Sequence, residues 1–118
     1  MKDTWNNAFA QMEAKAKELN ITGIAAIATL LADGSMRMEL KTYGKTFDDW
    51  GNYYAIACSK IMEMVRTGAP SGTLTPLAGE FSDFVGGIVQ GDTYLTFTGA
   101  TGEQDLEVAQ AGLAVFNQ

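Results

Sequence analysis

The sequence predicts an α/β (α+β) domain with a roughly five-stranded antiparallel sheet and helices on both faces. Three observations support this fold class. Helix-like apolar periodicity occurs at both ends of the chain. Asp33-Gly34 separates two strand-like runs, which is a strong hairpin signal. A second hairpin pattern, with its turn at Gln90–Asp92, leads directly into the last helix. The 118 residues are expected to form one domain, 1–118.

The first expected element is a helix that Asp3 or Thr4 caps and that runs to about Leu19, with Asn20 ending it. Its apolar side chains recur every three to four residues and define one face. These side chains are Trp5, Phe9, Met12, Ala16 and Leu19.

The next two elements are expected to be the strands of the first hairpin. Ile21–Leu31 is nearly continuously apolar, which favours a strand covered on both faces. Ser35–Tyr43 alternates apolar with charged residues, which indicates a half-exposed strand near the edge of the sheet.

A long second helix is expected from Thr46 or Asp48 to about Arg66. Its apolar face is wide, so it should be the central helix. This face comprises Trp50, Tyr53, Tyr54, Ala57, Ile61, Met64 and Val65. A loop at Thr67–Pro76 and a short helical turn at Leu77–Phe84 are expected to follow it.

The C-terminal part of the chain is expected to hold the best site candidate. Strands at Ile88-Val89 and Thr93–Thr98 lead to Gly99-Ala100-Thr101-Gly102, and a helix follows with Glu103 and Asp105 in its first turn. Two glycines at a strand-to-helix junction allow backbone N–H groups to approach a ligand. Simple turn-and-cap chemistry explains the same residues.

Composition excludes several classes of partner. Eight basic and fourteen acidic residues give a net charge of −6, which disfavours nucleic acids and anionic membranes. No apolar run reaches the roughly 20 residues that a membrane span needs. The N-terminus lacks the apolar core of a signal peptide, and one cysteine excludes an internal disulfide, so a cytoplasmic location is expected.

The residue types also limit the chemistry. The chain has no histidine, which removes the commonest metal ligand and all histidine-activated nucleophiles. Cys58 is expected to be a buried structural thiol, and Asp48-Asp49 to be helix-capping residues. We therefore assign neither catalytic nor metal-binding residues, and a binding protein is favoured over an enzyme.

The chain resembles the GlcG/HbpS-like domain family over nearly its whole length. The motifs that carry the resemblance are the strand and turn Thr-Gly-Ala-Thr-Gly-Glu-Gln-Asp at 98–105, Val108-Ala109, Ala111-Gly112-Leu113, the paired Gly86-Gly87, Asp33-Gly34 and Ala57-x-x-Lys60. The resemblance implies a profilin-like layout and a symmetric homo-oligomer. Some members of the family bind or degrade haem, and others form the corrinoid-binding domain of an adenosyltransferase.

The resemblance also implies a set of ligand-binding residues. These are Lys60, Gly86, Gly87, Gly99, Gly102 and Asp105. Lys60 is either a surface lysine whose stem covers apolar neighbours or an ammonium that faces a ligand carboxylate, such as a haem propionate. Without histidine, an axial haem ligand would be Tyr, Met or Cys, and Tyr43, Tyr53 and Tyr54 lie in or beside the second helix.

The leading hypothesis is a non-catalytic domain that binds a flat, mostly apolar small molecule, haem or a corrinoid being the family precedent. Two alternatives stay open: a metal-independent small-metabolite enzyme that uses Lys60 and Asp105, and a purely structural oligomerisation module. A homodimer or higher homo-oligomer is expected, because two tryptophans, four tyrosines, six phenylalanines and six methionines exceed what so small a core readily hides.

Overall fold

The structure is a computed structural model that describes residues 2–44, 47–72 and 85–118, with the side chains of residues 2 and 47–52 not described. Its elements are α1 (Lys2–Glu18), β1 (Gly23–Leu30), β2 (Met36–Tyr43), α2 (Phe47–Thr67), β3 (Gly87–Gln90), β4 (Thr93–Thr98) and α3 (Gly102–Phe116). The predicted turn at 77–84, the Thr46 cap, and the side chains of Asp48, Asp49 and Trp50 lie outside the described residues.

The four strands form one antiparallel sheet in the order β2-β1-β4-β3. The antiparallel sheet with helices on both faces is confirmed, but the prediction of five strands is wrong for the part of the chain that the structure describes. The reason is that the two hairpins join directly through β1 and β4, where Ala26 faces Thr96. The strand pattern itself located four segments, and all four are present.

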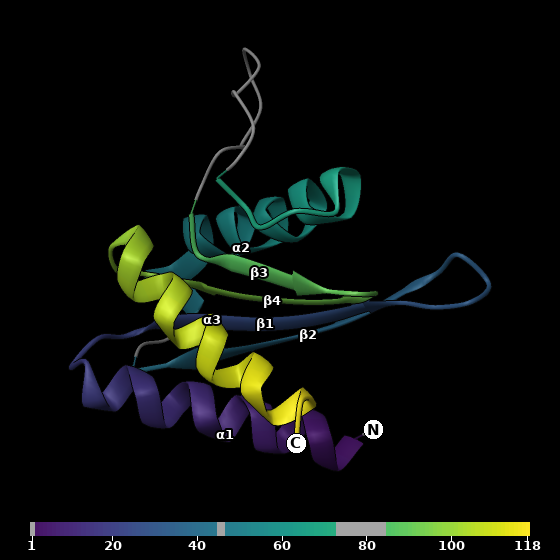
Figure 1. The fold of residues 1–118 in the computed structure, drawn as a ribbon. Helices are drawn as coiled ribbons and strands as arrows, with labels where there is room; N and C mark the ends of the chain where they lie inside the picture. Colours follow the sequence, from purple (N-terminus) through teal and green to yellow (C-terminus); the bar gives the residue numbers. More distant parts are fainter. Residues whose placement is uncertain (1, 45–46, 73–84) are drawn as a thin grey trace.

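The sheet lies between two helical layers (Figure 1). The helices α1 and α3 pack together on one face, over Ile27, Leu95 and Phe97. Among the described residues, α2 is the helix that covers the other face, with Ile61 and Met64 packed near Ala28. The inner strand β1 is buried over most of its length and β2 alternates half-buried with exposed residues, as predicted for an inner and an edge strand.

Two local predictions are confirmed: Asn20 ends the first helix, and Asp33-Gly34 forms the turn of the first hairpin. Asn20 takes a positive φ of 58°, and the N–H of Ile21 donates to the Ala16 carbonyl oxygen, which terminates α1 in the manner of a Schellman motif. In the first hairpin, Asp33 Oδ1 accepts bonds from the backbone N–H and the hydroxyl of Ser35 at 2.9 and 2.6 Å.

Two local predictions need correction. The helix α1 already begins at Lys2, so Asp3 and Thr4 lie in its first turn and do not cap it. Cys58 is half-buried, because it lies at the side of α2 and not on the face that meets the sheet.

Burial of the aromatic residues bears on the expected oligomer. Trp5, Phe9, Tyr94 and Phe97 are all at most 4% exposed. These four side chains are buried within one chain and do not require a partner, whereas Tyr53, at 36%, and Met62, at 49%, are exposed.

Candidate functional site

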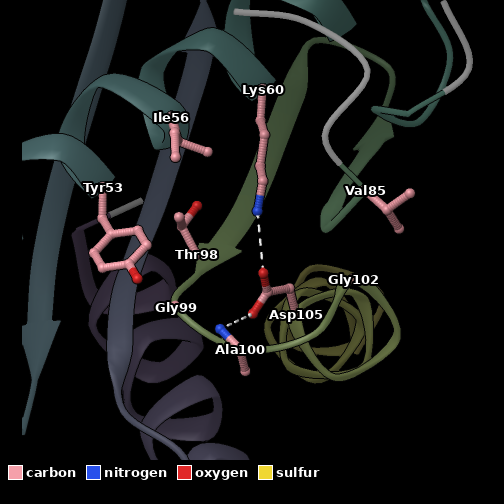
Figure 2. Close-up of a pocket in the computed structure, with 9 residues that line it drawn as sticks. All are labelled: Tyr53, Ile56, Lys60, Val85, Thr98, Gly99, Ala100, Gly102 and Asp105. Atoms are coloured by element: carbon pink, nitrogen blue, oxygen red, sulfur yellow. Dashed lines mark hydrogen bonds and ion pairs between the residues drawn. The ribbon is translucent and has the colours of Figure 1, made fainter.

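A buried ion pair links α2 to the start of α3. Lys60 extends from the inner face of α2, and its Nζ lies 3.3 Å from Oδ2 of Asp105 (Figure 2). The two side chains are only 2% and 5% exposed. Lys60 Nζ also donates to the carbonyl oxygen of Phe97 in β4, at 2.5 Å. Lys60 is therefore a buried side chain, and the interpretation as a surface lysine whose stem covers apolar neighbours is wrong.

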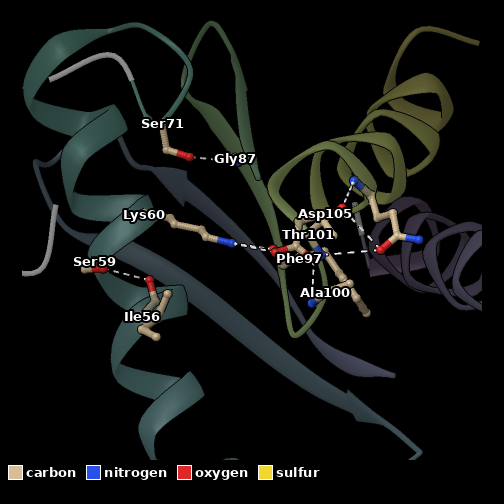
Figure 3. A network of polar contacts seen from close by, with 10 residues as sticks. Ile56, Ser59, Lys60, Ser71, Gly87, Phe97, Ala100, Thr101 and Asp105 are labelled. Atoms are coloured by element: carbon tan, nitrogen blue, oxygen red, sulfur yellow. Dashed lines mark hydrogen bonds and ion pairs between the residues drawn. The ribbon is translucent and has the colours of Figure 1, made fainter. Parts of the chain in front are cut away.

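The turn that follows β4 positions Asp105. Thr101 is the N-cap of α3, with a capping box in which its side chain accepts from the Gln104 N–H and Gln104 bonds back to the Thr101 N–H. This places Asp105 where its Oδ1 accepts the N–H of Ala100 at 3.1 Å, and Figure 3 shows this network beside Lys60. Asp105 is also favoured by the positive end of the helix dipole.

The electrostatics of the pair oppose its burial. Burial lowers the pKa of the Lys60 ammonium, against the attraction of Asp105. Burial likewise raises the pKa of Asp105, against the charge of Lys60 and the bond from Ala100. At an effective dielectric constant of about 20, a 3.3 Å separation gives an attraction of roughly 5 kcal/mol. Desolvation costs several kcal/mol per ion. The net contribution of the pair to stability is therefore close to zero, so stability does not explain why the pair is buried.

The backbone of Gly86 packs directly against the ion pair. Its φ is +126°, and an added Cβ would lie 2.6 Å from both Lys60 Nζ and the Cβ of Asp105. The Gly86 carbonyl oxygen also accepts the N–H of Phe97, at 3.1 Å. Only glycine allows the backbone to come this close to the ion pair.

A pocket of about 350 Å³ opens over the pair. Tyr53 and Ile56 of α2 and Val85 provide apolar surface around it, and Figure 2 shows the Lys60 chain descending between Thr98 and Val85. The complete lining is Tyr53, Ile56, Lys60, Val85, Thr98, Gly99, Ala100, Gly102 and Asp105. An apolar cleft with a few convergent polar groups is the usual form of a small-molecule site.

Thr98 adds an unsatisfied polar atom to this pocket. The residue is 3% exposed, and its Oγ1 has no hydrogen-bond partner within the described part of the chain. Thr96, two residues earlier, has an unpartnered Oγ1 as well. Side chains two apart lie on the same face of a strand, so both hydroxyls belong to the α2 face of β4, the face with Lys60. Buried polar groups normally have partners, so the unpartnered hydroxyl of Thr98 is a group that a bound ligand could satisfy.

The predicted site residues divide into two groups. Lys60, Gly99, Gly102 and Asp105 meet at the pocket. Gly86 and Gly87 do not line it. Gly86 packs against the ion pair, while the Gly87 N–H donates to Ser71 Oγ at 2.8 Å in the neighbouring loop (Figure 3).

The three tyrosines considered as haem ligands lie in different places. Tyr43 packs in the core on the α1 and α3 face, where its hydroxyl donates to the Phe9 carbonyl oxygen at 2.7 Å. Tyr53 lines the pocket, and half-buried Tyr54 packs near Ile24. The geometry leaves Tyr53 as the phenol at the candidate site. Among the described residues, no group of three or more histidine, cysteine or carboxylate side chains is arranged to hold a metal ion.

Sequence reasoning missed Thr98, Ile56 and Val85 as pocket residues. For Thr98 a signal was present: Tyr94, Thr96 and Thr98 alternate with apolar Leu95 and Phe97, which puts two threonines on one strand face. Ile56 and Val85 carried no signal, because an aliphatic side chain at a pocket rim resembles any other partly buried one.

A second pocket of about 410 Å³ lies between the ends of α1 and α3, lined by Thr4, Trp5, Thr29, Thr93, Val115, Phe116 and Gln118. None of its lining side chains has a buried, unpartnered polar atom. In the described chain, no helix is both long enough and apolar enough to cross a membrane.

Comparison with known proteins found no match among family models, curated proteins or solved structures. The GlcG/HbpS-like resemblance therefore stays a prediction, and the functional argument depends on the site itself.

Proposed function

We propose that this chain is a non-catalytic small-molecule-binding domain whose site is the pocket over Lys60 and Asp105. The observation that carries the proposal is that Thr98, with its unpartnered, buried hydroxyl, lines the same pocket as the buried ammonium of Lys60. Lys60 has three N–H groups, and Phe97 and Asp105 accept from it within the chain. The remaining N–H and the Thr98 hydroxyl are both donors, so they suit a ligand carboxylate or carbonyl oxygen.

The apolar side chains that line the pocket indicate the character of the rest of the ligand. Tyr53, Ile56 and Val85 offer an aromatic ring and two branched aliphatic side chains. Such walls favour a flat, largely apolar body that carries an acidic group at one edge. Haem, which the sequence resemblance implies together with corrinoids, has this character. Lys60 would hold a propionate and Tyr53 would contact the ring, and the bound haem would supply any redox or ligand-exchange chemistry.

The size of the pocket supports a homo-oligomer. Its volume of about 350 Å³ is near the lower end of the roughly 300–1,000 Å³ typical of ligand sites. One chain then holds the acidic edge of a tetrapyrrole, and a second copy covers the exposed ring. Tyr53 and Val85, 36% and 42% exposed, are the apolar residues at this rim. Light scattering in the presence of the ligand should give a multiple of 12.6 kDa, whereas a monomer mass would contradict the assembly.

Haemin titration tests the binding proposal. A saturable Soret shift at micromolar haemin is expected. Haemin dimethyl ester, whose propionates are masked, should bind at least about tenfold more weakly, a difference of roughly 1.4 kcal/mol. No saturable shift would remove the tetrapyrrole as a ligand. Equal affinity for the ester would contradict the role of Lys60.

A further inference from the structure

We propose that Lys60 captures carbonyl compounds as an imine, so that the pocket takes aldehydes or ketones with a small apolar body as well as carboxylates. The inference rests on the proposed ligand pocket but adds covalent chemistry to it. It follows from three features: a buried lysine amine, a carboxylate within reach of the same nitrogen, and an unpartnered hydroxyl at the pocket wall.

The position of Lys60 favours a nucleophilic amine. The side chain is held by Phe97 and Asp105 with 2% exposure, in surroundings that disfavour its charged form. Each unit by which an amine pKa falls raises its neutral fraction about tenfold near pH 7. Desolvated lysines in apolar pockets form Schiff bases for this reason. No other titratable group of the described residues lies in the pocket besides Tyr53 and Asp105.

Asp105 can carry the protons of the reaction. It first accepts a proton from the Lys60 ammonium, which frees the nitrogen lone pair to form a bond to the carbonyl carbon while the carbonyl π pair moves to oxygen. A proton passes from nitrogen to that oxygen through the carboxyl group and gives a carbinolamine. Asp105 then protonates the hydroxyl, which leaves as water as the nitrogen lone pair forms the C=N bond. One carbonyl compound and one ammonium give one iminium and one water.

The product retains the electrostatics of the site. The iminium carries one positive charge and one N–H, which can point to Asp105 as the ammonium does at 3.3 Å. No unpaired charge is buried at any stage, so the reaction avoids the cost that leaving one partner of the pair uncompensated would bring. The Thr98 hydroxyl provides a donor for the carbonyl oxygen before attack.

Reductive trapping tests the inference on the unmodified protein. The chain is incubated at pH 7 with benzaldehyde, which matches the apolar walls, together with cyanoborohydride, and the labelled lysines are located by peptide mass spectrometry. Lys17, whose side chain is 77% exposed, and exposed Lys41 are internal controls in the same sample. Lys60 should be labelled at least about tenfold faster than either, because the pocket holds the aldehyde next to its nitrogen. In urea, where the pocket is absent, the three rates should converge.

Labelling of Lys60 no faster than that of Lys17 would overturn the inference. The outcome is independent of the haemin titration: a saturable Soret shift without preferential Lys60 labelling removes only the imine, and preferential labelling without a shift removes only the tetrapyrrole. Protection of Lys60 by benzoate, a carboxylate of the same shape, would support one pocket for both ligand classes. Rapid labelling that benzoate does not slow would contradict the shared pocket.

Discussion

Lys60→Met should destabilise the fold because it leaves the carboxylate of Asp105 buried without its cation. Removing one partner of a buried pair costs about 3–5 kcal/mol, a large part of the roughly 5–15 kcal/mol that a domain has. The structure favours the lower part of that range, since Asp105 keeps its bond from Ala100 at 3.1 Å. Lys17→Met, at an exposed lysine, is the matched control and should change stability by within about 0.5 kcal/mol.

The loss in Lys60→Met should depend on pH. Burial raises the pKa of Asp105, and the variant lacks the lysine charge that opposes this rise. For a carboxyl whose folded pKa is raised, the neutral form stabilises the folded state below the unfolded pKa, and that stability is lost as the pH rises through the folded pKa. The variant should therefore lose least stability relative to wild type near pH 4 and most at neutral pH and above.

Urea unfolding measures both effects, and a double variant completes the test. In Lys60→Met with Asp105→Asn, neither charge of the pair remains and the amide oxygen can still accept the Ala100 N–H. Its loss should be smaller than the sum of the single losses by about 2 kcal/mol, within the range for residues in contact. Additive losses, or a Lys60→Met loss under about 1 kcal/mol at pH 7, would refute the account of the pair.

Three further variants test the surroundings of the pair. Gly86→Ala should lower the free energy of unfolding by about 3 kcal/mol or more, because the added Cβ would lie too close to Lys60 Nζ. The control Gly34→Ala, also at positive φ but with open space around it, should lower it by about 1 kcal/mol in urea unfolding. Equal losses would contradict the close approach. Thr98→Val should leave the stability of the fold unchanged or raise it by about 1 kcal/mol, because the hydroxyl that it removes has no partner. The same variant should weaken haemin binding about tenfold in a Soret titration. Unchanged affinity would exclude the hydroxyl from the site. Thr101→Ala removes the N-cap of α3 and should lower the thermal midpoint by a loss of about 1 kcal/mol, and an unchanged midpoint would show that the cap is not needed.

Local patterns made most of the fold predictable. The alternation in Met36–Tyr43 identified an edge strand, and Asp33-Gly34 and Asn20 gave the turn and the helix end that the structure contains. These signals act over a few residues, so the sequence displays them directly. The number of strands in the sheet depends instead on which segments meet, and the direct pairing of β1 with β4 was not visible in either segment alone.

The site was predictable only in part for the same reason. Lys60 and Asp105 were both identified as candidates, but they are 45 residues apart, and their ion pair depends on how α2 lies over β4. The burial of Lys60 excluded its interpretation as a surface lysine. Burial depends on tertiary packing, which the sequence does not display. Gly86 was identified as a ligand-binding candidate, and the structure places it against the ion pair and not among the residues that line the pocket.

The most direct test of the ligand site is amide-shift mapping of the isotope-labelled chain during titration with zinc protoporphyrin, a diamagnetic analogue of haem. The pocket over Lys60 predicts saturable shifts at Thr98–Asp105 and along α2 near Tyr53 and Ile56, and no shifts at the second pocket near Thr29 and Phe116. Shifts confined to the second pocket, or no saturable shift anywhere, would contradict the assignment of this pocket as the ligand site.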